Sequence, residues 1–255
     1  MPRPGYVTIT RPNSDAATYL GSIALGHAVS YMRSRGIYVD DLAADRATRD
    51  SVLRSLSTFD SIYFTGVGHG NNTTFTGQNQ QPVFWKCNCD ELRGRVVFLL
   101  SCLTGAELGP DIVSKGGLSF IGYKEEFVWV QERVVDPLTD SIAKAFFEPV
   151  MEIHYRLADG YTAGDAYRAS IDRWNYWIDY WSRQSDPVAS TIVMFLVHDR
   201  DAQVLYGDSS ARIATPAALT IVPWAITAVT MTMMPIIIPI SVAGFEEMAK
   251  SPSPK

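Results

Sequence analysis

The sequence predicts an α/β fold in which helices cover both faces of a mostly parallel β-sheet of six strands. Segments of strand length alternate with helical segments up to about residue 213, a pattern typical of such sheets. Residues 95–101 form an apolar run between polar segments, as expected of a central parallel strand that is buried on both faces. Sheets of this kind place their ligand sites at the carboxyl ends of the strands.

The first half of the chain predicts three strands and two helices. Residues 6–10 are β-branched and predict the first strand. The turn Arg11-Pro-Asn-Ser-Asp can cap a helix over residues 16–35, which has apolar residues at helical spacing and ends at Gly36. The remaining elements predicted here are a strand at 37–39, a helix at 45–56 and a strand at 61–66.

The second half begins with residues 71–81, whose polar, glycine-containing sequence predicts a loop or a small hairpin. Strand 95–101 then leads into Cys102 and a short helix that ends near residue 114. The elements predicted after it are a strand at 116–123, helices at 137–157 and 162–184, a sixth strand at 191–197, and residues 204–208, which close the domain. Aromatic residues of the helix at 162–184 recur three and four positions apart, so we interpret them as core.

We expect one domain at residues 1–213, followed by a hydrophobic C-terminal segment at 214–255. Residues 217–245 contain no charged side chain and are numerous enough to span a bilayer. The prolines within this run argue against one straight helix, although membrane helices tolerate proline better than soluble ones do. The segment is therefore either a membrane anchor or an apolar arm that packs on the domain or on a protein partner.

Composition excludes several classes of function. The formal net charge is −5 and no run of Lys or Arg occurs, so we expect no nucleic-acid binding. Three cysteines make no disulfide framework, and the Cys87/Cys89 pair has no second pair to complete a zinc site. The N-terminus lacks the apolar core of a signal peptide, which favours an intracellular, cytoplasmic location. The absence of a G-x-G-x-x-G or Walker motif argues against a nucleotide-binding protein.

A candidate catalytic pair stands at two predicted strand ends. Cys102 is the candidate nucleophile, and His69, between Gly68 and Gly70, is its proton-transfer partner. We expect the imidazolium and the start of the following helix to favour the thiolate of Cys102. The backbone N–H groups of Gly70 and Cys102 are candidate donors to an oxyanion. Glycine on both sides of His69 allows close approach to a substrate.

The sequences around the pair resemble those of a known group of enzymes. Thr65-Gly-Val-Gly-His-Gly and Phe98-Leu-Leu-Ser-Cys-Leu-Thr-Gly resemble the two catalytic blocks of the caspase–gingipain clan of cysteine peptidases, and the second block is most similar to the gingipain family. Thr162-Ala-Gly-Asp-Ala-Tyr-Arg and Leu205-Tyr-Gly-Asp-Ser-Ser resemble later blocks of gingipain-like domains, with Ser209 where proline is usual. The resemblance spans about residues 5–213 and is loose outside the two catalytic blocks.

The resemblance implies a caspase-like fold, which is a flavodoxin-like three-layer sandwich, and cysteine endopeptidase activity. Cys102 would attack the carbonyl of a protein or peptide substrate and form a thioester acyl-enzyme, while His69 protonates the leaving amine. This chemistry requires no metal and no cofactor, although some relatives bind calcium structurally.

The resemblance also suggests where a substrate side chain is recognised. In this clan the segment after the strand that follows the catalytic one contributes to the primary pocket, and here that segment contains Glu125, Glu126 and Trp129. Either glutamate could receive a basic side chain, or both could be solvated loop residues. Trp129 could form an apolar pocket wall.

Two other functions stay open at this point. A catalytically inactive caspase-like scaffold or signalling module would have the same fold, because a fold does not guarantee an activity. A different Cys–His hydrolase or transferase, acting on a non-peptide substrate, would use the same pair of side chains.

Overall fold

The computed structural model of the chain describes residues 2–133 and 136–214. One sheet has the strand order β2-β1-β3-β7-β8-β9. Its strands are β1 (Arg3–Arg11), β2 (Tyr38–Ala43), β3 (Ser61–Val67), β7 (Val96–Leu100), β8 (Ser119–Tyr123) and β9 (Gln203–Gly207). All neighbours pair in parallel except β8 and β9, which are antiparallel. The prediction of a mostly parallel, six-stranded sheet is confirmed.

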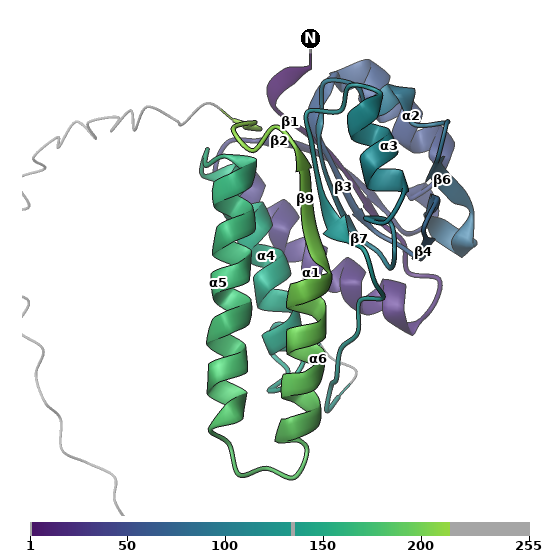
Figure 1. Cartoon of the computed structure of the whole chain (residues 1–255). Helices are drawn as coiled ribbons and strands as arrows, with labels where there is room; N and C mark the ends of the chain where they lie inside the picture. The colour runs from purple at the N-terminus through teal and green to yellow at the C-terminus, as the bar shows by residue number, and fades with distance from the viewer. Residues whose placement is uncertain (1, 134–135, 215–255) are drawn as a thin grey trace, which may run out of the picture. The chain divides into compact units, whose positions relative to one another are not determined.

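Helices lie on both faces of this sheet, so the domain has three layers (Figure 1). They are α1 (Ala16–Ser34), α2 (Arg49–Phe59), α3 (Leu108–Ser114), α4 (Lys144–Ala158), α5 (Ala163–Ser182) and α6 (Ala189–Ala202). Helices α1, α4, α5 and α6 share one apolar core with one face of the sheet, and α2 and α3 share a second core with the other face. Short 3-10 turns occupy Ala44–Arg46, Gln78–Gln80 and Asp90–Leu92.

The central strands are buried throughout. Every residue of β3 and of β7 is buried. Along β7, Val96, Phe98 and Leu100 belong to the first core, whereas Val97 and Leu99 belong to the second. Side chains that alternate between two apolar layers explain why this strand reads as a continuous hydrophobic run.

The prediction of a strand at 191–197 is wrong, because these residues belong to helix α6. The sixth strand is instead β9, within the segment expected to close the domain. The β-branched residues favour a strand by propensity, but the buried positions of α6 are spaced as on one helix face. These positions are Ala189, Ile192, Leu196, Asp199 and Ala202. Packing of that face, mainly against α5, outweighs the weak local preference.

The polar segment between β3 and β7 is more ordered than a loop. It forms a small antiparallel sheet of β4 (Gly70–Asn71), β5 (Thr74–Thr76) and β6 (Pro82–Trp85). The predicted hairpin corresponds to β4 and β5. Phe75 and Phe84 of this small sheet pack into the second core, which fixes the backbone just after His69.

None of the helices within residues 2–133 and 136–214 is long and apolar enough to cross a membrane. The apolar segment 217–245, predicted to be a membrane anchor or a packing arm, lies outside the described residues.

Candidate active site

The two candidate catalytic residues stand at the carboxyl ends of neighbouring strands. In the parallel pair β3–β7, Val67 is the register partner of Leu100. His69 lies two residues beyond Val67, and Cys102 lies two residues beyond Leu100. The register therefore brings both residues to the same edge of the sheet, as expected for a ligand site in an α/β fold.

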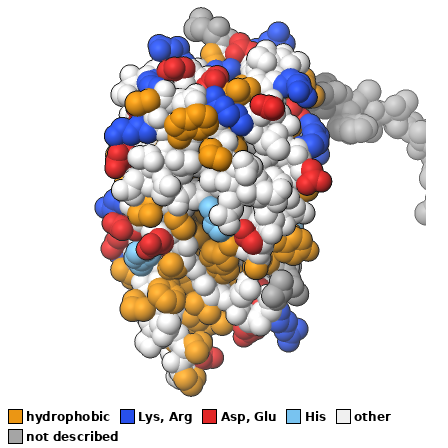
Figure 2. Space-filling model, turned by 90° about the vertical axis from the view of Figure 1, so that its right-hand side faces the viewer, with side chains coloured by type: hydrophobic (Ala, Val, Ile, Leu, Met, Phe, Trp, Pro, Cys, Tyr) orange, Lys and Arg blue, Asp and Glu red, His pale blue; other side chains and the backbone are white. Residues whose placement is uncertain are grey.

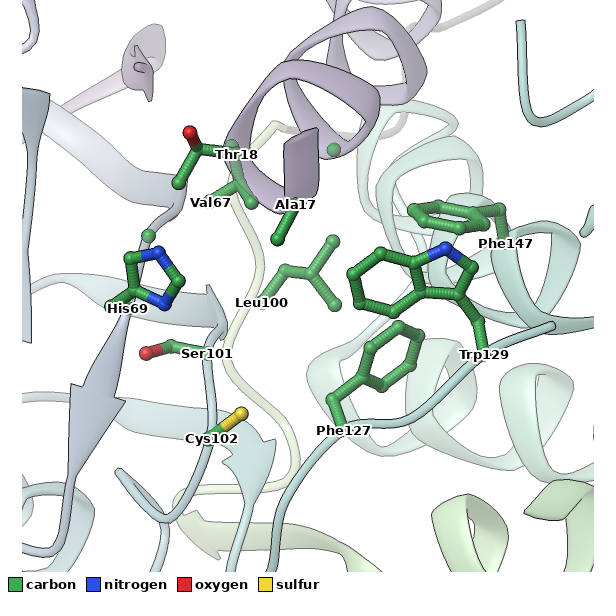
Figure 3. A pocket seen from close by; sticks show the side chains of 12 residues that line it. Ala17, Thr18, Val67, His69, Leu100, Ser101, Cys102, Phe127, Trp129 and Phe147 are labelled. Carbon is green, nitrogen blue, oxygen red and sulfur yellow. The ribbon is translucent and has the colours of Figure 1, made fainter. Parts of the chain in front are cut away.

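His69 and Cys102 line one pocket, which has a volume of about 50 Å³. Figure 3 shows the pocket between the start of α1, the ends of β3 and β7, and the segment that contains Phe127 and Trp129. Polar groups gather at one side of this pocket, where Thr18, His69 and Ser101 lie. The two side chains of the candidate pair make no hydrogen bond to each other, and the imidazole of His69 bonds to Asp15 instead.

Asp15 orients the imidazole of His69. The Oδ2 atom of Asp15 lies 2.7 Å from Nε2 of His69, and Asp15 is also the N-cap of α1, accepting a hydrogen bond from the N–H of Thr18. Partial burial opposes ionisation of Asp15, but the hydrogen bonds from Thr18 and His69 and the nearby imidazole hold its pKa below the usual value. An ionised carboxylate only accepts hydrogen bonds, so Nε2 of His69 carries the hydrogen.

This hydrogen bond determines which ring nitrogen can act as a base. With Nε2 protonated, neutral His69 has its free lone pair on Nδ1. In Figure 3 one ring nitrogen points toward Thr18 and the other toward the side of Ser101 and Cys102. The arrangement gives the imidazole one nitrogen for an orienting carboxylate and one for the pocket.

The glycines around His69 are required by packing within the protein. A Cβ at Gly68 would lie 2.0 Å from the carbonyl oxygen of Thr76, and a Cβ at Gly70 would lie 2.2 Å from Oγ of Ser101 and 2.6 Å from the carbonyl oxygen of Cys102. The backbone after β3 thus passes directly against the backbone of the Cys102 loop. Gly70 therefore allows the close approach of the two loops, and Gly68 allows close approach to strand β5.

The Gly70 amide is not committed to the small sheet. The N–H of Thr76 donates to the carbonyl oxygen of His69, and Gly70 is the register partner of Phe75. Hydrogen-bonded and non-hydrogen-bonded pairs alternate in an antiparallel ladder, so Gly70 and Phe75 form a non-hydrogen-bonded pair. The N–H of Gly70 is left without a ladder partner, beside Cys102.

Cys102 is a half-buried thiol, and its surroundings favour the protonated form. Burial raises its pKa above the ordinary value, the N–H groups of Phe127 and of Cys102 itself act in the opposite direction, and the charges of Glu126 and Asp199 raise it again. Helix α3 begins only at Leu108. The helix start therefore does not lower the pKa of the thiol as we expected.

The backbone turns sharply after Cys102. Leu103 has a positive φ of 62°, which is uncommon for a residue with a branched side chain. Its N–H donates to the carbonyl oxygen of Glu125, and the N–H of Gly105 donates to that of Tyr123. These bonds tie the Cys102 loop to the segment that follows β8.

That segment places its three candidate residues differently. Trp129 lines the pocket, whereas Glu125 and Glu126 have exposed side chains and are not among the lining residues. Phe127, which lies between Glu126 and Trp129 in the sequence, is buried and also lines the pocket.

Sequence reasoning missed Asp15 and Phe127. Asp15 carried only the signal of a helix cap, and its distance of 54 positions from His69 gave no indication of contact. Phe127 lies two residues before Trp129, within the segment that the resemblance assigns to the primary pocket. This pair of aromatic residues is the sequence feature that could have identified Phe127.

The other three histidines lie outside the pocket and contact other parts of the domain. His154 is fully buried beside Tyr63, His27 of α1 bonds to Asp136, and Nε2 of His198 lies 2.8 Å from the carbonyl oxygen of Glu126. His198 belongs to α6, not to the end of a strand. In the described part of the chain no three His, Cys, Asp or Glu side chains gather as metal ligands.

Two solved structures have a similar fold. The Arg-specific cysteine proteinase gingipain R aligns with a TM-score of 0.57 and 11% sequence identity, over 83% of this chain and 48% of that chain. The complex of the RgpB pro- and mature domains from Porphyromonas gingivalis aligns with a TM-score of 0.55 and 11% identity, over 83% and 49%. This chain thus spans about half the length of these proteins.

The structural likeness confirms the predicted caspase-like α/β fold, which is a scaffold used by cysteine proteinases. At 11% identity it shows the fold alone. The sequence matches no protein-family model and is not detectably similar to any curated protein.

Proposed function

We propose that the chain is a cysteine endopeptidase in which Cys102 is the nucleophile and His69 transfers the proton. One observation carries the proposal: both residues lie two positions beyond register-paired strand ends and line one pocket. A nucleophile, a base and an orienting carboxylate arranged in this way are the parts that acyl transfer requires.

The reaction follows from the roles of these atoms. Nδ1 of His69 accepts the proton of the Cys102 thiol, and the sulfur attacks the peptide carbonyl carbon. The N–H groups of Gly70 and Cys102 stabilise the resulting oxyanion. The C–N bond then breaks as the imidazolium protonates the leaving amine, which leaves a thioester. Water, deprotonated by His69, attacks the thioester carbonyl, and the released thiolate recovers the proton.

Asp15 acts as a positioning residue in this scheme. Its carboxylate holds the ring with Nδ1 toward the pocket and stabilises the imidazolium that forms when the thiol loses its proton. Because burial raises the pKa of Cys102, the resting site holds a thiol. The charge separation therefore develops with a substrate in place, when water has been displaced.

A catalytically inactive scaffold is the second candidate, and two observations favour it. Burial raises the pKa of Cys102, which disfavours the nucleophilic thiolate, and no hydrogen bond joins the thiol to His69. In this alternative the pocket would bind a peptide without cleaving it.

The deciding experiment incubates the full chain with a fluorogenic peptide library. Wild type is compared with Cys102→Ala, with His69→Ala, and with Cys87→Ala as a matched control, because Cys87 is a free, exposed thiol outside the pocket. We expect cleavage by wild type and Cys87→Ala and none by the other two variants. Equal rates of cleavage by wild type and Cys102→Ala would rule out Cys102 as the nucleophile. Absence of cleavage by wild type would support the catalytically inactive scaffold.

A further inference from the structure

The pocket beside Cys102 has a polar side and an apolar side. The polar side carries His69 and Ser101, and the apolar side is formed by Leu100, Phe127, Trp129 and Phe147. In Figure 3 the sulfur of Cys102 points between Leu100 and Phe127, toward the aromatic groups. If the sulfur bonds to a substrate carbonyl carbon, the side chain of the residue that supplies this carbonyl group would lie on the apolar side.

Three aromatic rings form the far wall of this apolar side. The ring centroids of Phe127 and Trp129 lie 6.0 Å apart, and each lies 5.9 Å from that of Phe147. Phe147 comes from α4, whereas the other two come from the segment after β8. Aromatic rings in mutual contact at these distances make a stable apolar surface.

Hydrogen bonds to helix α6 hold the segment that contains Phe127 and Trp129 in place. Oδ1 of Asp199, on the buried face of α6, accepts a hydrogen bond of 3.1 Å from the N–H of Val128. Nε2 of His198 lies 2.8 Å from the carbonyl oxygen of Glu126, and the N–H of Lys124 donates to the carbonyl oxygen of Ala202. Alternate residues of the wall segment are thus bonded to the last two turns of α6.

No ionised side chain is available inside the pocket for a basic group. None of the lining residues is Asp, Glu, Lys or Arg. Glu125 and Glu126 are exposed outside it, and the carboxyl of Asp199 is fully buried behind Val128. A cation placed in the pocket would lose its hydration without gaining a carboxylate to pair with, which is costly. Figure 2 shows few Lys or Arg side chains among the hydrophobic ones on the lower half of its face.

We propose that this pocket selects a peptide with an apolar side chain at the residue that supplies the carbonyl group, of the size of Val, Leu or Met. The inference rests on the proposed peptidase function and adds its substrate class. The rings of Phe127, Trp129 and Phe147 close the far end of the apolar side, which favours an aliphatic chain over an indole. Gingipain R, whose fold is similar, is described as Arg-specific, so the two proteins would differ in the side chain they accept.

Cleavage measurements on the full chain test the preference. Fluorogenic peptides that differ only in the residue before the cleaved bond are compared by kcat/KM. Leu should exceed Arg, Lys and Asp by on the order of 100-fold. Trp129→Ala should shift the preference toward Phe and Tyr by about tenfold or more, because it enlarges the pocket. If Trp129→Ala does not fold, Trp129→Leu replaces it in this test. Trp85 lies outside the pocket, so Trp85→Ala is the control and should leave the preference unchanged.

A binding measurement separates this inference from the peptidase function. Product-like peptides that end in Leu or Arg are titrated into full-length Cys102→Ala and followed by NMR. Stronger binding of the Leu peptide supports the inference even if wild type cleaves nothing, in which case the peptidase function is what fails. A preference for Arg in either assay, or no binding of the Leu peptide, overturns the apolar pocket, and loss of an Arg preference in Glu126→Gln would assign recognition to Glu126.

Discussion

His69 and Asp15 are joined by a hydrogen bond of 2.7 Å between Nε2 and Oδ2, although they belong to different loops of the fold. Asp15 begins helix α1, and His69 follows strand β3. One carboxylate therefore caps a helix and orients an imidazole. This dual role makes it possible to separate the stability of the domain from the chemistry of the pocket.

Replacing Asp15 with Ser should lower activity while the helix cap is kept. Ser is a good N-cap but cannot stabilise an imidazolium as a carboxylate does. We expect kcat to fall by about 10- to 100-fold with an unchanged melting temperature. Asp15→Ala, which loses both roles, should also lower the melting temperature. Full activity in Asp15→Ser would show that the contact does not serve catalysis.

Alkylation of Cys102 should become fast only at alkaline pH. Because burial, and then the charges of Glu126 and Asp199, raise its pKa above 9.0, the rate of iodoacetamide labelling should have a midpoint above that value. Glu126→Gln should lower the midpoint. The rate is measured by mass spectrometry in Cys87→Ala, and rapid labelling at neutral pH would show that the resting site already holds a thiolate.

Gly70→Ala should disturb the contact between the two loops. Its Cβ would lie 2.2 Å from Oγ of Ser101, so the loops must separate, at a cost of about 1–3 kcal/mol in the free energy of unfolding. Gly26→Ala is the matched control, because its Cβ would meet Arg11 at an ordinary 3.5 Å within helix α1. Chemical denaturation should show loss of stability in the first variant and none in the second.

His154 should make the domain sensitive to acid. Burial lowers its pKa from 6.5 to about 3, so the unfolded chain takes up a proton that the folded chain excludes. The stability that depends on neutral His154 is therefore fully present above pH 6.5. As the pH falls toward 3, the free energy of unfolding decreases by up to about 1.4 kcal/mol per pH unit. His154→Asn should show a weaker decline in this range than wild type in denaturation at a series of pH values. Parallel declines would assign the acid sensitivity to other groups.

Asp199 should have the opposite dependence on pH. Burial raises its pKa well above 3.8, so the folded chain keeps a proton that the unfolded chain releases. The stability that it contributes is present at low pH and is lost as the pH rises from about 3.8 toward the raised pKa. Asp199→Asn cannot ionise and should be at least as stable as wild type at neutral pH. Lower stability of this variant at pH 7 would show that the carboxyl is needed in its charged form.

The alternation of apolar strands and amphipathic helices was enough to predict the layers and the position of Cys102 at a strand end. It did not distinguish helix α6 from a strand, because Ile192 and Val193 favour strands locally while the buried face emerges only on packing against α5. The contact between Asp15 and His69 was also out of reach, since it depends on how two loops meet in three dimensions. Exposure of Glu126 likewise follows from the path of the chain after β8.

The attachment of the pocket wall to α6 has a consequence for the order in which the protein is made. Cys102 and His69 leave the ribosome early, but Asp199 and Ala202, which hold the wall segment, come near the end of the domain. Strand β9, which pairs with β8 beside them, comes later still. A nascent chain therefore has both candidate catalytic residues long before it has the pocket wall. If the proposed peptidase function holds, newly made copies should stay inert toward other proteins until the whole domain has emerged and folded.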